Sequence, residues 1–145
     1  MAVDMQNIAP AGQRSADDML DLLSRRFRPE LIQQRKIGGR QVSYVPVAAV
    51  IERLNRACNT WHFRIVSRER ETMILNRWND ATRKSEPRDV TVSVVVGELE
   101  IPEIGMRQAI GVQALDDGSG EDLIKGAASD SLKKCASLFG VPLEG

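Results

Sequence analysis

Metal-binding and reactive side chains are scarce in this sequence. Its 145 residues include two cysteines and one histidine, and only 4% are aromatic. The cysteines do not form a CxxC pair and His62 is alone, so we expect no metal site. Cys58 and Cys135 lie in apolar helical patterns, where a free thiol packs as a small hydrophobic side chain. Such cysteines favour a reducing cytosol.

Long apolar runs and an excess of one charge are also missing. No hydrophobic run has membrane-spanning length, and the N-terminus does not read as a signal peptide. We therefore expect a soluble cytoplasmic protein with no membrane partner. Twenty Lys and Arg balance twenty Asp and Glu, so the net charge does not indicate a nucleic-acid partner. The charges are unevenly spread, because residues 24–40 carry six basic side chains and residues 98–122 carry seven acidic ones.

The side chains needed for catalysis are poorly represented. His62 alternates with aromatic residues in an extended pattern and has no adjacent Ser or Cys. A cysteine nucleophile would need a lowered pKa and a base, which the pattern does not specify. The acids Asp116, Asp117, Glu121 and Asp122 fit no EF-hand loop, and the glycines match neither a P-loop nor a dinucleotide fingerprint. We therefore expect a protein that is not an enzyme, with a cysteine- or acid-dependent enzyme as the alternative.

The first part of the chain reads as an arm followed by a helix. Residues 1–14 are polar and rich in small side chains, which predicts a flexible arm, and residues 15–145 are predicted to form one domain. Ser15 and Asp18 form a cap-like pair that begins an amphipathic helix. Pro29 closes this helix off.

A hairpin and a second helix are predicted next. Gly38 and Gly39 separate two extended runs within residues 31–45, which is typical of a two-residue hairpin turn. Pro46 suits the first turn of the following helix, because its missing N–H would be unpaired there. Arg53 is expected on the exposed side of this helix.

The rest of the chain is predicted to be strands followed by a long helix. A polar segment at residues 79–89 is expected to be a loop, and Ser119 with Asp122 is expected to cap a final helix that stops at Gly140. The fold class is therefore α+β, a curved antiparallel sheet of the hairpin and three to four further strands, packed against helices. The further strands are expected at residues 61–66, 72–78, 90–96 and 106–115.

Basic residues gather in two places that a compact fold could bring together. The hairpin carries Arg35, Lys36 and Arg40, and the final helix carries Lys133 and Lys134. Such side chains attract phosphates, and a cleft between them could hold a nucleic-acid backbone without reading its bases. The alternative is that these charges form ordinary solvated faces.

Several ordered motifs resemble a known family. The run QRKIGGRQVSYVPVAAVIERLN, then Trp61, then the ending SDSLKKCASLFGVPLEG are similar to the eukaryotic single-strand annealing mediators of the Rad fifty-two family. The bacterial relatives of that family include DNA-damage-response protein A (DdrA) of radiation-resistant bacteria, and phage annealing proteins. The resemblance covers roughly residues 31–145, and relatives continue into a tail that we expect the natural protein to share.

The resemblance implies a β-β-β-α annealing fold that assembles into closed homo-oligomeric rings. Single-stranded DNA would lie in a basic outer groove with its bases outward, and no cofactor is needed because base pairing drives annealing. The residues that match the family's DNA contacts are Arg35, Lys133 and Lys134. Lys36, Arg40 and Lys125 are further candidates for DNA contact. Tyr44 and Trp61 are candidates for base stacking or for packing.

Departures from the family pattern bear on function. Ser137 stands where eukaryotic members have a further Arg, which removes one charge from the groove. The loop before the final helix is acidic and lacks the family's additional lysines, which counts against a second outer DNA site. The predicted function is single-stranded DNA binding in recombinational double-strand-break repair, at the nucleoid, protecting ends as some bacterial relatives do, with strand annealing as a further activity. The alternative is a ring-forming interaction domain that recruits other repair proteins and binds little DNA.

Overall fold

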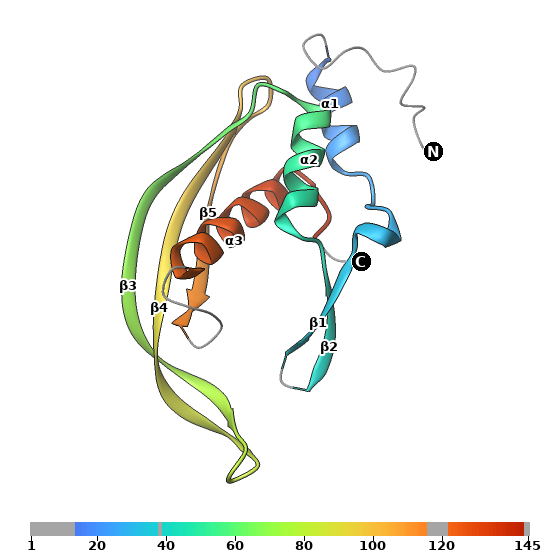
Figure 1. Cartoon of the computed structure of the whole chain (residues 1–145). Coiled ribbons are helices and arrows are strands. Elements are labelled where there is room, and N and C mark those ends of the chain that lie inside the picture. The colour runs from blue at the N-terminus through green and yellow to red at the C-terminus, as the bar shows by residue number, and fades with distance from the viewer. Residues whose placement is uncertain (1–13, 38, 116–121, 144–145) are drawn as a thin grey trace.

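The computed structural model describes residues 14–37, 39–115 and 122–143. The α+β class predicted from the sequence is confirmed, with antiparallel sheets and three α-helices (Figure 1). In chain order the elements are α1 (Ala16–Leu23), the 3-10 helix η3 (Pro29–Leu31), β1 (Gln33–Ile37), β2 (Arg40–Tyr44), α2 (Val47–Ala57), β3 (His62–Asn79), β4 (Lys84–Ile101), β5 (Gly105–Ala114) and α3 (Asp122–Leu138).

The main sheet has three antiparallel strands in the order β3-β4-β5. Its two longest strands, of 18 residues each, bow around α3 (Figure 1). Helix α3 packs unusually close to β5, because a Cβ on Gly111 would overlap the backbone of Ala127 and Ser131. This close contact fixes the helix on the sheet and so sets the direction of its basic side chains.

The predicted hairpin is confirmed, but it stands apart from the main sheet. Strands β1 and β2 pair only with each other and form a separate two-stranded sheet. Gly39 has φ of +79°, the conformation that a tight turn requires and that glycine adopts freely. The sequence predicted a single sheet, but the structure has two. Helix α2 follows β2 after a short connection and separates the hairpin from the strands of the main sheet along the chain.

The prediction of a loop at residues 79–89 is wrong. Strand β4 begins at Lys84, which pairs with Asn79 across a short turn, and the ladder continues unbroken as far as Ser67. We call residues 74–79 and 84–89, on either side of this turn, the projecting arm; their side chains are mostly exposed on both faces, so the hydrophobicity of the arm has no period of two. The two strands pair along the whole arm, and they run side by side to its tip (Figure 1).

The helices and one end of the main sheet share a single core. Its fully buried large side chains include Met19, Leu23, Leu54, Leu99 and Cys135. Cys58 and Cys135 are both free and buried, as the sequence predicted. Burying a leucine-sized side chain contributes about 1.5–3 kcal/mol, so this cluster is a main source of stability.

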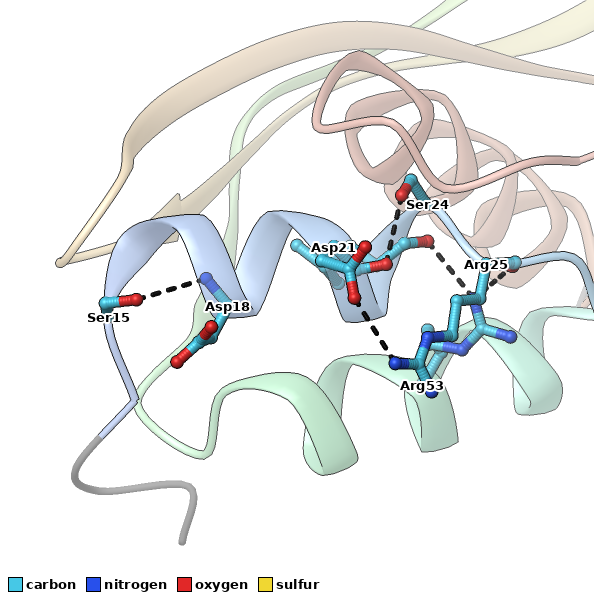
Figure 2. Close-up of polar contacts among 7 residues, drawn as sticks. Ser15, Asp18, Asp21, Ser24, Arg25 and Arg53 are labelled. Carbon is cyan, nitrogen blue, oxygen red and sulfur yellow. Dashed lines mark hydrogen bonds and ion pairs between the residues drawn. The ribbon is translucent and has the colours of Figure 1, made fainter. Parts of the chain in front are cut away.

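The helix ends show which local signals are correct. Ser15 Oγ accepts a hydrogen bond from the Asp18 N–H at 3.2 Å, so the predicted cap of α1 is confirmed (Figure 2). Pro46 is the N-cap of α2 and not part of its first turn. At the end of α3, the N–H of Val141 donates to Ala136 O and that of Gly140 to Ser137 O, a Schellman ending.

Some predictions cannot be compared with the structure. The cap at Ser119, the acidic loop at residues 116–121 and nearly all of the arm at residues 1–14 lie outside the described residues. None of the helices within residues 14–37, 39–115 and 122–143 is long and apolar enough to cross a membrane.

Candidate nucleic-acid interface

The register of the hairpin decides which of its basic residues act together. Arg35 pairs with Val42, and Gln33 pairs with Tyr44, so these residues share one face of the two-stranded sheet. Arg40 lies on the same face, because it is two and four residues from Val42 and Tyr44. We call the face of the hairpin that carries Gln33, Arg35, Arg40, Val42 and Tyr44 the Tyr44 face.

Two cations from distant parts of the chain meet over the ring of Tyr44. The guanidinium carbon of Arg35 lies 6.0 Å from the ring centroid, and Nζ of Lys133 lies 5.4 Å from it. The Tyr44 hydroxyl donates to Gln33 Oε1 at 2.8 Å, which holds the ring in place. The predicted juxtaposition of the hairpin with the final helix is therefore present, with both cations close to one half-buried aromatic ring.

The pKa of Lys133 reflects its burial first and its charged neighbours second. Burial lowers the pKa of Lys133 because it removes water from the ammonium group, and the nearby Arg35 lowers it further. Asp130 acts in the opposite direction but does not cancel these effects. A phosphate close to Arg35 and Lys133 would stabilise both positive charges, including the partly desolvated ammonium group, so the arrangement suits an anion.

The second lysine of the doublet points elsewhere. Nζ of Lys134 lies 3.0 Å from Asp130 Oδ2, and the same oxygen accepts the backbone N–H of Val112 at 2.9 Å. Adjacent helical residues are about 100° apart around the axis, so Lys133 can face the hairpin while Lys134 turns toward β5. Ser137, which replaces a family arginine, donates its hydroxyl to Lys134 O at 2.7 Å.

Two further candidates do not join the Tyr44 face. Lys36 alternates with Arg35 along β1, so its side chain leaves the opposite face of the hairpin. Lys125 lies eight residues before Lys133, about 12 Å along the axis of α3. Both are exposed, and neither has an ion pair within the part of the chain that the structure describes. Of the six basic candidates, the structure brings Arg35 and Lys133 together at Tyr44, and Arg40 shares the hairpin face of Arg35.

The two aromatic candidates have different settings. Trp61 packs against the main core and donates its Nε1–H to Asn55 Oδ1 at 2.9 Å, which fits the packing alternative. Tyr44 lies at the centre of the basic site. The only sign of this in the sequence is the alternation along the hairpin, which puts Tyr44 on the same face as Arg35. The prediction that Arg53 is exposed is wrong, because its guanidinium group donates hydrogen bonds to the backbone carbonyls of Leu23 and Arg25.

A metal-ligand cluster or a reactive thiol would be a further source of chemistry. No group of three His, Cys, Asp or Glu side chains is placed to hold a metal among residues 14–37, 39–115 and 122–143. Burial raises the pKa of Cys58 to about 11 and also raises that of Cys135, so both thiols stay protonated at neutral pH.

The comparisons with known proteins identify a family. A search of curated proteins finds none with significant similarity. A family model described as Rad52/22 family double-strand break repair protein matches residues 15–143, which is nearly the whole chain and includes β1, β2 and α3. The matched residues therefore hold the entire Tyr44 face, and the chain belongs to the Rad52/22 family of double-strand break repair proteins.

Proposed function

We propose that this protein binds single-stranded DNA by placing backbone phosphates on the Tyr44 face. The observation that carries the proposal is the meeting of Arg35 and Lys133 over one aromatic ring, 6.0 Å and 5.4 Å from its centroid. Arg35 adds a planar fork for phosphate oxygens, and Lys133 adds a compact charge. Arg40, on the same face, extends the positive surface toward the turn of the hairpin.

Backbone contacts of this kind leave the bases unread. Binding would be independent of sequence and strongly dependent on salt, because its energy comes from releasing counterions. A strand held by its phosphates keeps its bases free to pair with a complement, so the same surface supports annealing. We propose no catalytic step and no cofactor for this activity.

We further propose that several copies assemble into a ring, as the family resemblance implies. The basic site of one copy is small, and repetition around a ring would align many such sites along one strand. Such an assembly, acting at the nucleoid, would protect exposed single-stranded ends in the way implied by its likeness to DdrA and phage annealing proteins. Other repair proteins would be its partners.

Fluorescence anisotropy with a labelled single-stranded oligonucleotide tests the proposal. We expect binding at low salt that weakens steeply as salt is raised, with weaker binding to duplex DNA. No binding at low salt would refute the DNA-binding function. Mass in solution tests the assembly separately, since a monomer at micromolar concentration would contradict the ring.

A second function is favoured by one observation. Lys134, half of the basic doublet, is already paired with Asp130 at 3.0 Å, which removes one charge from the DNA-binding surface. The alternative is therefore a ring-forming interaction domain that recruits repair partners and binds little DNA. This alternative predicts a normal ring mass and no change in anisotropy at low salt.

A further inference from the structure

A groove lies on the α1–α2 side of the molecule, away from the Tyr44 face. It has a volume of about 490 Å³ and is formed by the end of α1, the segment through η3, and α2. Pockets of this size accept a short chain segment or a small molecule and not a whole protein surface. Its most frequent lining residue is arginine: Arg25, Arg26, Arg28, Arg53 and Arg56.

Acidic side chains only partly balance these five arginines. Arg25 bonds to Asp21 at 3.2 Å (Figure 2). Arg56 lies 3.6 Å from Glu52, but these side chains are 60% and 62% exposed, so their attraction is weak. With Glu30, the lining and its ion-pair partners carry five positive and three negative charges, leaving a net positive groove.

One of the arginines is a fixed part of the wall. Arg53 donates to Leu23 O at 3.1 Å and also to Arg25 O, carbonyls at the end of α1 (Figure 2). Its guanidinium carbon lies 4.2 Å from the ring centroid of Phe27. Burial and repulsion from Arg25 and Arg56 lower the pKa of Arg53, so the groove is crowded with positive charge that an anion would offset.

The remaining arginines are available to a ligand. Arg26 and Arg28 are exposed on either side of buried Phe27, and neither has an ion-pair partner within the described residues. Leu31, beside them in the lining, leaves 39% of its surface exposed. The groove thus offers two free guanidinium groups next to an apolar floor.

We propose that this groove binds a short acidic peptide segment of a partner protein, with carboxylates on Arg26 and Arg28 and an apolar side chain against Leu31. Arginine binds carboxylates through two parallel hydrogen bonds, which suits this pair. A peptide is favoured over nucleic acid because Glu30 and Glu52 interrupt the arginines, whereas a phosphate chain needs a continuous basic track. The site does not depend on the proposed DNA binding, since none of its residues lies on the Tyr44 face.

A defined peptide tests this site on the full chain. The acidic probe is a short fluorescein-labelled peptide of Asp and Glu residues interrupted by one Leu and one Phe. A second peptide, the amide probe, has Asn in place of each Asp and Gln in place of each Glu. We expect the acidic probe to bind and the amide probe not to. The double substitution R26E and R28E should weaken binding by about tenfold or more, because two charge-assisted hydrogen bonds are lost.

Matched controls separate this site from general charge effects and from DNA binding. The substitutions R68E and R70E make the same change in charge at exposed positions of β3 and should leave peptide affinity unchanged. Leu31→Ser should weaken the acidic probe, and should not affect a version that lacks its Leu and Phe. Equal binding of the acidic and amide probes, equal losses in the two charge variants, or displacement of the probe by single-stranded DNA would each overturn the proposal.

Discussion

Removing the two cations that meet over Tyr44 should change both the strength and the salt dependence of DNA binding. In the double variant R35A and K133A, the two groups at 6.0 Å and 5.4 Å from the ring are lost, while the ring itself stays held by Gln33. Each phosphate neutralised on a single strand contributes about 0.7 to the slope of log affinity against log salt, so the slope should become shallower by about 1.4.

The expected size of this effect is large enough to measure. Over a fourfold rise in salt, a slope difference of about 1.4 corresponds to about a sevenfold difference in relative affinity. The wild type should therefore bind much more tightly than the variant at low salt, and this advantage should shrink by about sevenfold across that range. Fluorescence anisotropy with a labelled oligonucleotide at several salt concentrations measures both quantities.

A matched control distinguishes position from charge. The double variant K36A and K125A removes the same charge from exposed sites that lie off the Tyr44 face. Its slope should remain close to that of the wild type. Equal changes in the two double variants, at equal fold and assembly, would show that overall charge explains binding, and an unchanged slope for R35A and K133A would refute the proposed site.

Three further substitutions and one chemical treatment probe the packing, the charge balance and the thiols. Replacing Gly111 by Ala should lower the free energy of unfolding by about 1–3 kcal/mol in urea, because the new methyl group overlaps the backbone of α3; an unchanged midpoint would contradict this close packing. Asp130→Asn removes the carboxylate that pairs with Lys134 and also acts on Lys133, so it should raise affinity for single-stranded DNA, whereas lower affinity would contradict the charge argument. Cys58 and Cys135 should resist alkylation at neutral pH until the protein unfolds, and rapid labelling of the folded protein would contradict their burial. Burial raises the pKa of Cys58 from 9.0 to about 11, so the folded state holds the thiol proton more tightly than the unfolded state. The resulting stability is fully present below pH 9 and is lost as pH rises through about 11. In Cys58→Ala, this part of the fall in the free energy of unfolding should be absent.

Local chemistry explains what the sequence predicted well. Ser15 caps α1 because a hydroxyl one residue before a helix can accept an N–H of its first turn. Gly39 gives the hairpin its turn, and the alternation along the strands puts Arg35 and Tyr44 on one face. These features depend on a few neighbouring residues, so a sequence is enough to find them.

Features that depend on tertiary contacts were not predictable in the same way. The arm around Asn79 and Lys84 is held by strand pairing and carries no buried face, so no hydrophobic pattern marks it. Lys133 and Lys134 are adjacent and chemically equal in the sequence, and only the seating of α3 against Gly111 decides which one faces the hairpin. Arg53 is inward because the end of α1 lies beside α2, a proximity that its own helix does not reveal.

Photo-cross-linking tests the central claim most directly. The full chain would be cross-linked to single-stranded DNA that carries a photoreactive thymidine, and the modified peptides identified by mass spectrometry. If DNA lies on the Tyr44 face, the main cross-links should fall in β1, in β2 and in the part of α3 around Lys133. Cross-links confined to the β3–β4 arm or to the arginine groove, with none on these three elements, would contradict it.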